Sequence, residues 1–192
     1  YLSSTGIDFV GPSRGAQACG DSGYGRMSEP EEIFETIMLT QSKPLTGKKI
    51  IITAGPTREQ IDPVRFISNN SSGKMGFAMA EAAARSGAEV ILISGPVSLS
   101  CLPQIQRLDV QTADEMYKEA QSLMSDADIF IGCAAVADFK PAHQNIQKIK
   151  KTDEDRLNIE LQKNIDIISS LAREFTDKRF MGFCAETERI EE

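Results

Sequence analysis

Short apolar segments alternate with helical segments from residue 49 onward, and this alternation constrains the fold more than any other feature of the sequence. The apolar segments, such as "KIIITAG" and "EVILISG", are apolar at nearly every position, which is typical of strands buried on both faces. The helical segments between them include "KMGFAMAEAAARSG", which is rich in alanine and ends at Gly87. Because strands that alternate with helices form parallel sheets, the sequence predicts an α/β fold: a doubly wound, Rossmann-like parallel sheet with helices on both faces.

The expected elements follow one another regularly, apart from one segment. Strands are expected at residues 49–55, 89–95, 105–112, 127–139 (running into a loop) and 179–187, and helices at residues 74–87, 112–125 and 164–175. The exception is residues 147–164, "QKIKKTDEDRLNIELQKN". Here Ile149 lies in a basic strand, and apolar residues recur at a period of two after a polar turn. This pattern predicts a β-hairpin flap.

The first part of the chain has a different composition. Residues 1–30 are rich in glycine, serine and proline, so "QACGDSGYGRMSEP" is expected to be a loop. A short helix is expected at residues 30–39, where a proline and acids open an apolar pattern. The segment "TQSKPLTGKK", residues 40–49, resembles a linker. A domain boundary is therefore expected there, between residues 1–42 and residues 43–192.

Composition excludes several classes of function. The formal net charge of −7 argues against broad electrostatic binding to nucleic acid or to an anionic membrane. No apolar run reaches the roughly 18 residues that a membrane span needs, and no secretion signal is visible. The four cysteines are widely separated without a CxxC pair, which predicts reduced thiols in the cytoplasm. Since His143 is the single histidine, zinc clusters and Ser-His-Asp catalysis are not expected, and any metal would be a hard ion such as Mg²⁺.

Ligands of such sheets bind beyond the carboxyl ends of the strands, and those ends are rich in small and polar residues here. They are "TAGPTRE", "SGPVS", "AAVADFK" and "GFCAETE". In "NNSSGKMGFAMAEAAARSG", Ser72 and Gly73 precede a helix, where unpaired amides and the helix dipole favour a phosphate. A tight strand-to-helix connection that needs glycine for steric reasons explains the same residues, and no standard nucleotide fingerprint decides between the two.

Several charged residues also have two interpretations each. The lysines of "KIKK", residues 148–151, either surround a triphosphate or protect an exposed sheet edge. Asp138 either binds ribose hydroxyls or Mg²⁺, or it caps a turn. Arg58 and Arg65 either hold a phosphate or carboxylate, or they form surface ion pairs. The residues alone therefore predict a doubly wound domain that binds a phosphorylated ligand.

Four long motifs resemble those of the phosphopantothenoylcysteine synthetase domain of the bacterial bifunctional coenzyme A biosynthesis proteins. They are "ITAGPTREQIDPVRFISNNSSGKMG", "SGPVSL", "GCAAVADFKP" and "KIKK". The N-terminal "GPSRGAQACGDSGYGRMSEP" resembles the substrate-recognition loop at the end of the decarboxylase that precedes this domain in the family. The resemblance covers essentially the whole chain. It implies that residues 1–42 are the tail of the decarboxylase with a linker and that residues 43–192 are the synthetase domain.

The resemblance implies a phosphopantothenate–cysteine ligase that uses CTP and Mg²⁺. CTP activates the carboxylate of 4'-phosphopantothenate as an acyl-cytidylate, and the amine of L-cysteine then attacks to give the amide. Lys148 matches the lysine needed to form the acyl-cytidylate, where a cation neutralises charge on the phosphates. Asn69 matches the asparagine needed to convert this intermediate into product. No metal ligand is assigned, and the implied CTP contacts are Gly132, Cys133, Ala134, Asp138, Lys148, Ile165, Asp166, Ile167, Ile168 and Phe183.

The resemblance also implies a role for Cys19, which matches the proton-donating cysteine of the FMN-dependent decarboxylase. A thiol suits that step because its pKa lies near the working pH. The flavin-binding core is absent from this sequence, so decarboxylation is expected of the full-length protein and not of this chain alone. The family's later basic segment is missing after Glu192, and the family's "KNPDI" lacks its proline at residues 163–167. The synthetase site is therefore expected to be C-terminally incomplete.

The family implies a homodimer through the synthetase domain and a larger homo-oligomer of the full-length protein. Two other functions remain open. A nicotinamide-dependent reductase is favoured by the fold but lacks the GxGxxG fingerprint. A catalytically incomplete nucleotide-binding fragment is favoured by the missing basic segment.

Overall fold

The computed structural model describes residues 9–16, 22–41, 43–150 and 157–183. The chain divides into two compact units, Tyr1–Pro44 and Leu45–Glu192. Within the described residues, no helix combines the length and the apolar character that crossing a membrane requires.

The first unit contains a two-stranded hairpin and one helix. β1 (Ser13–Ala16) pairs antiparallel with β2 (Ser22–Arg26), and α1 (Pro30–Gln41) follows. α1 confirms the helix predicted at residues 30–39, since a first-position proline and acids in the first turn suit a helix start. β2 corrects the predicted loop: its glycines and serine disfavour a strand locally, but pairing with β1 satisfies the backbone groups. Cys19 lies outside the described residues.

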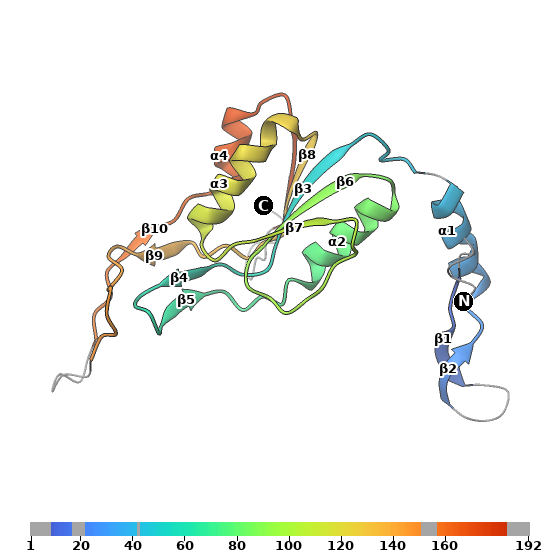
Figure 1. Cartoon of the computed structure of the whole chain (residues 1–192), viewed down its shortest axis with the longest axis horizontal. Helices are drawn as coiled ribbons and strands as arrows, with labels where there is room; N and C mark the ends of the chain where they lie inside the picture. The colour runs from blue at the N-terminus through green and yellow to red at the C-terminus, as the bar shows by residue number, and fades with distance from the viewer. Residues whose placement is uncertain (1–8, 17–21, 42, 151–156, 184–192) are drawn as a thin grey trace, which may run out of the picture. The chain divides into compact units, whose positions relative to one another are not determined.

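The second unit is built on a five-stranded parallel sheet with the strand order β11-β8-β3-β6-β7 (Figure 1). Its strands are β3 (Lys49–Ala54), β6 (Glu89–Ser94), β7 (Gln106–Asp109), β8 (Ile129–Gly132) and β11 (Arg179–Gly182). The chain adds β6 and β7 on one side of β3, and then crosses to add β8 and β11 on the other. The predicted doubly wound parallel sheet is confirmed. Its strand order reverses between β3 and β8, where ligand crevices form in such folds.

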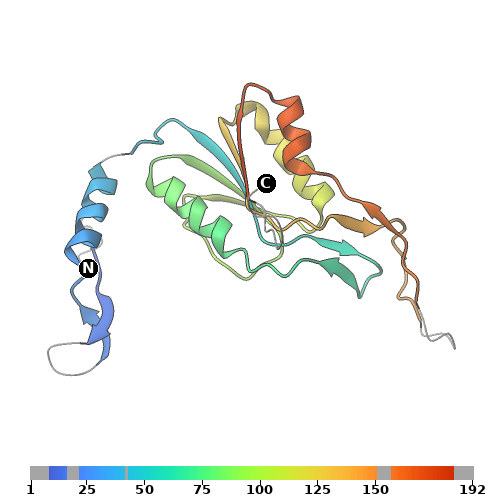
Figure 2. The same cartoon turned by 180° about the vertical axis from the view of Figure 1, so that it is seen from behind.

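Helices cover both faces of this sheet, as predicted. They are α2 (Lys74–Arg85), α3 (Ala113–Leu123), the short 3-10 helix η2 (Met124–Asp126) and α4 (Ile167–Glu174). α2 packs in the core cluster that contains Ile52, whereas α3 and α4 pack in the cluster that contains Ile51, and they cover opposite faces of the sheet (Figures 1 and 2). Successive residues of β3 are fully buried because alternate side chains enter the two clusters. This explains why the strand is apolar at nearly every position.

Among the described residues of the second unit, two small antiparallel pairs lie outside the main sheet. β4 (Arg58–Gln60) pairs with β5 (Phe66–Ser68) in a hairpin that the sequence patterns do not predict. β9 (Phe139–Pro141) pairs with β10 (Leu161–Lys163) at the base of a protrusion that we call the arm, residues 139–150 and 157–163. The two halves of the arm run side by side away from the sheet (Figures 1 and 2).

The arm corrects the position of the strands in the predicted flap. The sequence periodicity predicts a hairpin at residues 147–164 with Ile149 in a strand, but the strand pairing lies at the base of the arm, between β9 and β10. The Ile149 N–H donates instead to Asp62 Oδ2 (3.1 Å), and the Ile149 carbonyl accepts from Arg65 Nη2 (2.8 Å). Because these partners belong to the turn of the β4–β5 hairpin, the backbone groups of Ile149 are not used for a strand ladder.

Candidate active site

A crevice of about 890 Å³ lies at the carboxyl end of the sheet, beside the point where the strand order reverses. Its walls come from the ends of β3, β8 and β11, the loop before α2, and the chain between β10 and α4. It is lined by Thr53, Asn69, Met75, Phe130, Gly132, Cys133, Ala134, Ala135, Val136, Ala137, Asp138, Lys163, Asn164, Ile165, Asp166, Ile167, Ile168 and Phe183. Both the position and the volume are typical of ligand sites in parallel α/β folds, where pockets measure about 300–1,000 Å³.

The loop after β8 forms the longest wall of the crevice, and its main chain is tied to the loop after β3. The Cys133 N–H donates to the Thr53 carbonyl (3.1 Å). Further along, the Ala137 N–H donates to the buried hydroxyl of Thr57 (3.1 Å). The first bond is between backbone groups and the second is from backbone to a side chain. The wall is therefore held by hydrogen bonds to β3 and to the loop that follows it.

Asn164 joins this wall to the chain that leads into α4. Its Nδ2 donates to the Ala137 carbonyl (3.0 Å), and its N–H donates to the Asp138 carbonyl (2.7 Å). The Asn164 side chain is only 7% exposed, whereas Asp138 is exposed and lines the crevice. Asn164 is not among the site residues predicted from the sequence. The available signal was an asparagine two residues before the Asp166 helix cap.

Asn69 connects the loop before α2 with the loop after β8. Its Nδ2 donates to the Val136 carbonyl (2.9 Å) and more weakly to the Ala135 carbonyl (3.4 Å). Asn69 therefore stands at the contact between two walls of the crevice. A ligand in the crevice would meet this amide directly, since Asn69 belongs to the lining.

The glycines at the start of α2 have a packing role. Gly73 is the N-cap residue with φ +75°, and a Cβ there would lie 3.3 Å from the Cα of Gly55. One turn later, a Cβ on Gly76 would lie 2.6 Å from the Cβ of Ala54. The close approach is thus made by the end of β3 itself, which supports the steric interpretation of this stretch.

Two titratable groups of the crevice have shifted pKa values. Asp166 caps α4: its carboxylate accepts from the Ser169 N–H (2.9 Å) and the Ser169 hydroxyl (2.7 Å), and these bonds lower the pKa of Asp166. Burial raises the pKa of the Cys133 thiol, which lies 3.4 Å from the sulfur of Met79. Asp166 is therefore ionised and engaged as a cap, and Cys133 is a neutral thiol at pH 7.

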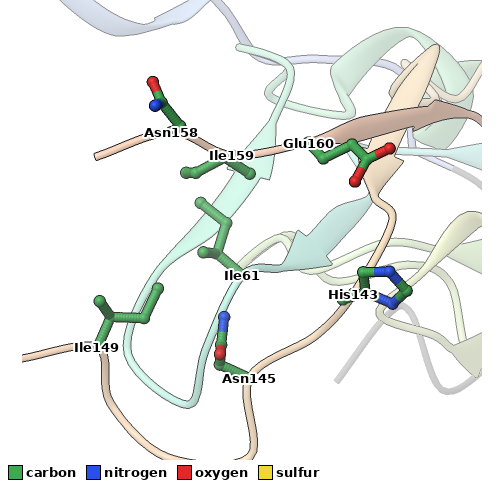
Figure 3. Close-up of a pocket in the computed structure, with 7 residues that line it drawn as sticks. All are labelled: Ile61, His143, Asn145, Ile149, Asn158, Ile159 and Glu160. Atoms are coloured by element: carbon green, nitrogen blue, oxygen red, sulfur yellow. The ribbon is translucent and has the colours of Figure 1, made fainter. Parts of the chain in front are cut away.

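Lys148 lies outside the crevice. All the other CTP contacts that the resemblance implies line it together with Asn69, but Lys148 is exposed on the arm. The arm and the β4–β5 hairpin enclose a second, smaller pocket of about 220 Å³, in which Ile61 of the hairpin lies among Ile149 and Ile159 of the arm (Figure 3). His143 lines this second pocket and not the crevice.

The two arginines of the "TREQIDPVR" stretch have partners within the protein. The Arg58 guanidinium lies 4.7 Å from the centre of the Phe66 ring. Arg65 forms an ion pair with the buried carboxylate of Asp62. Arg65 thus forms an ion pair, which is one of the two interpretations that the sequence left open for it. Arg58 packs on an aromatic ring instead.

The described residues contain no group of three or more His, Cys, Asp or Glu side chains that could hold a metal ion. Mg²⁺ at nucleotide sites is commonly held by one or two carboxylates together with phosphates and waters. Asp138 is an exposed carboxylate of the crevice, and it fits that kind of site.

The fold and the crevice define an α/β protein with a candidate ligand site at the switch point of a doubly wound sheet. Residues 45–192 match the model of the DNA/pantothenate metabolism flavoprotein C-terminal domain, and the chain belongs to this family. The family resemblance seen in the sequence motifs is thereby confirmed.

Close relatives carry the name coenzyme A biosynthesis bifunctional protein CoaBC. The chain is 51% identical over 193 residues to the protein of Vibrio vulnificus (strain YJ016), covering 99% of this chain and 48% of the relative. It is 50% identical over 198 residues to the protein of Escherichia coli (strain K12), covering 100% of this chain and 48% of the relative. The chain therefore spans about half the length of the curated relatives that it matches.

Solved structures show the same fold. The crystal structure of the C-terminal domain of a coenzyme A biosynthesis bifunctional protein CoaBC matches with a TM-score of 0.69 and 42% identity, covering 78% of this chain and 70% of that chain. A Cab2 mutant in complex with phosphopantothenate-cysteine matches with a TM-score of 0.65 and 19% identity, covering 84% of this chain and 73% of that chain. At this identity the second match supports the fold alone.

Proposed function

We propose that this chain carries a phosphopantothenate–cysteine ligase site, which joins 4'-phosphopantothenate to L-cysteine with CTP as the activating nucleotide. The observation that supports it is the convergence of Asn69, the loop after β8 and the start of α4 on one crevice of nucleotide size. Family membership and the names of the relatives point in the same direction.

The proposed reaction has two steps. The carboxylate of 4'-phosphopantothenate attacks the α-phosphorus of CTP, so that an O–P bond forms and pyrophosphate leaves. The amine of cysteine then attacks the acyl carbon of the acyl-cytidylate. A C–N bond forms, the bond from the acyl carbon to the CMP oxygen breaks, and the amine loses a proton.

Each proposed role follows from the chemistry of a side chain. Asn69 orients the acyl carbonyl or the attacking amine through its amide. Asp138 binds the ribose hydroxyls or Mg²⁺, and a bound Mg²⁺ would neutralise charge on the phosphates. Lys148 supplies a cation to the phosphates in the first step, which requires the arm to approach the crevice together with the β4–β5 hairpin on which it is docked. The nucleoside contacts are assigned to Gly132, Cys133, Ala134, Ile165, Asp166, Ile167, Ile168 and Phe183.

The N-terminal unit belongs to a second proposed activity. We assign residues 1–42 to the end of a decarboxylase domain, in which Cys19 would donate a proton and a bound FMN would supply the oxidation and reduction. The full-length protein would then decarboxylate the ligase product to 4'-phosphopantetheine. We also propose that it works in the cytoplasm as a homodimer through the synthetase domain and as a larger homo-oligomer overall.

Pyrophosphate release tests the ligase proposal. The full-length protein is mixed with CTP, Mg²⁺ and 4'-phosphopantothenate without cysteine, and pyrophosphate is measured in a single turnover. We expect release by the unmodified protein, at least tenfold slower release by Lys148→Gln, and unchanged release by Lys118→Gln, which alters an exposed lysine of α3. In the complete reaction, Asn69→Asp should still release pyrophosphate but form little amide.

Two outcomes would contradict the proposal. The first is that the unmodified protein does not release pyrophosphate from CTP. The second is that Lys148→Gln and Lys118→Gln release pyrophosphate equally fast.

A further inference from the structure

We propose that Asp62 is a positioning residue for Lys148: its carboxylate fixes the backbone of Ile149 and thereby the point from which the neighbouring lysine reaches the phosphates. The inference rests on the proposed function, because Lys148 has a role only in that reaction. It assigns a role to the turn of the β4–β5 hairpin, which contributes no residue to the lining of the crevice.

The carboxylate of Asp62 is fully buried and accepts hydrogen bonds at both oxygens. Oδ1 accepts from the N–H groups of Val64 (2.8 Å) and Arg65 (2.9 Å), which closes the turn of the hairpin. Oδ2 accepts from Arg65 Nε (2.9 Å) and from the Ile149 N–H (3.1 Å). One of these donors thus comes from the arm, far away in the sequence, although the turn alone could satisfy most of the carboxylate.

Arg65 also holds the backbone of Ile149, through the carbonyl of that residue. Its Nη2 donates to Asp62 Oδ2 and also to the Ile149 carbonyl (2.8 Å). Ile149 is therefore held at its N–H and at its carbonyl by two side chains that also hold each other. A planar guanidinium suits this double contact, since its donors have a fixed geometry.

The negative charge on Asp62 strengthens its hydrogen bonds to Arg65 and Ile149 at neutral pH. Burial alone raises the pKa of Asp62, but hydrogen bonds from the Arg65 side chain and from the N–H groups of Val64, Ile149 and Arg65 outweigh it. The pKa of Asp62 therefore lies well below its usual range. Hydrogen bonds to an ionised acceptor are roughly twice as strong as those between neutral groups.

The arm is docked on the hairpin along several residues. The Asn145 N–H donates to the Ile61 carbonyl (2.9 Å), and Ile61 and Ile149 face each other across the second pocket (Figure 3). In this docked stretch Ile149 is half-buried, while Lys148 is exposed. The backbone is thus fixed at the residue next to the lysine, and the lysine side chain itself stays available.

The placement matters because a shift of about 1 Å at a catalytic group can change a rate by roughly a hundredfold. Replacing Asp62 by asparagine keeps the size of the side chain but removes the charge and turns one acceptor into a donor. That donor would face the Arg65 guanidinium and the Ile149 N–H, so the hydrogen bond from the Ile149 N–H is lost. We expect acyl-cytidylate formation to slow by about 10- to 100-fold.

The test separates the two steps of the reaction in the full-length protein. Step one is measured as single-turnover pyrophosphate release without cysteine, and step two as amide formation from pre-formed acyl-cytidylate and cysteine. Asp62→Asn should slow the first step and leave the second within about twofold of the unmodified protein. A residue with only a structural role would affect both steps alike.

A matched control and a double variant sharpen the result. Asp128→Asn removes another carboxylate that accepts from a backbone N–H (Lys49, 2.9 Å) and from a lysine (Lys48, 2.9 Å), but at the amino end of the sheet. This control should leave both steps unchanged. In a Lys148→Gln background, Asp62→Asn should have no further effect on pyrophosphate release, because the group that it positions is gone.

Three outcomes distinguish the inference from the proposed function. If Lys148→Gln releases pyrophosphate as fast as the unmodified protein, the proposed function fails. The inference alone fails if Lys148→Gln releases pyrophosphate slowly while Asp62→Asn releases it as fast as Asp128→Asn. It also fails if the effects of Lys148→Gln and Asp62→Asn on pyrophosphate release multiply in the double variant. If Asp62→Asn does not fold, Arg65→Lys takes its place in the test. This variant keeps the ion pair with Asp62 but loses the hydrogen bond from the guanidinium to the Ile149 carbonyl. It must then slow the first step selectively, as expected for Asp62→Asn.

Discussion

Gly95 follows β6, where its Cα faces the loop after β3. A Cβ built on Gly95 would lie 1.7 Å from the Pro56 carbonyl oxygen and 2.8 Å from the Pro56 carbonyl carbon. An ordinary C···O contact is about 3.3 Å, so Gly95→Ala forces the two segments apart by about 1.6 Å. Neither segment is free to move, because the Gly95 N–H donates to the Ala54 carbonyl (2.9 Å) and Pro56 pairs with Ala135.

The expected loss of stability follows from this geometry. Overpacking of a well-packed site costs about 1–3 kcal/mol, and we expect the upper end because both clashing partners are backbone. For a chain of this length, about 3 kcal/mol lowers the melting temperature by roughly 6–12 °C. Gly47→Ala is the control: nothing lies within 4 Å of its Cβ, and its φ of +78° alone costs about 1–2 kcal/mol.

Thermal and urea unfolding of the two variants provide the assay, with calorimetric titration of CTP as a second measurement. Gly95→Ala should melt well below Gly47→Ala. It should also bind CTP more weakly, since Pro56 pairs with Ala135 in the wall of the crevice. If Gly95→Ala melts at the same temperature as Gly47→Ala, Gly95 and Pro56 do not pack closely enough to exclude a methyl group.

Three further predictions concern the crevice. Asn164→Ala leaves the Ala137 carbonyl without its side-chain partner, and urea unfolding should show a loss of about 1–3 kcal/mol; a loss below 0.5 kcal/mol contradicts this role. Hydrogen bonds from Ser169 lower the pKa of Asp166 in the folded protein. The contribution of Asp166 to the free energy of unfolding is therefore complete above the unfolded pKa of about 4 and is lost as pH falls through the folded pKa. Asp166→Asn should accordingly flatten the pH dependence of stability below pH 4. The raised pKa of Cys133 predicts slow alkylation by iodoacetamide at pH 7, acceleration above about pH 9, and protection by CTP, measured by peptide mass spectrometry.

The main sheet could be predicted from the sequence because its signals are local. β3 and β6 are apolar at nearly every position, and both are buried on both faces. α3 begins with a capping box between Thr112 and Glu115, so the residues that set its start lie within one turn. β2 could not be predicted, because its residues become a strand only through pairing with β1.

Some residues of the candidate site could likewise be predicted from the sequence and others could not. The family motifs indicate most residues of the crevice, because the residues of such motifs lie together in the fold of the family. Asn164 was missed because its role depends on a carbonyl 27 residues earlier in the chain. The role of Gly76 could not be predicted either, since only the folded structure places the Ala54 Cβ of β3 within 2.6 Å of a Cβ added at Gly76.

The arm shows how one long-range contact changes both the fold and the site. The period-two pattern of residues 147–164 is real, but the backbone of Ile149 bonds to Asp62, 87 residues away, and not to the opposite half of the arm. A backbone N–H that is held by an ionised carboxylate is not available to a ladder, and among the described residues of the arm the strand pairing is that of β9 with β10. The same bond keeps the residue beside Lys148 on the hairpin, outside the lining of the crevice. The failed strand prediction at Ile149 and the docking of the residue beside Lys148 on the hairpin therefore have a single cause, which the Asp62→Asn variant tests.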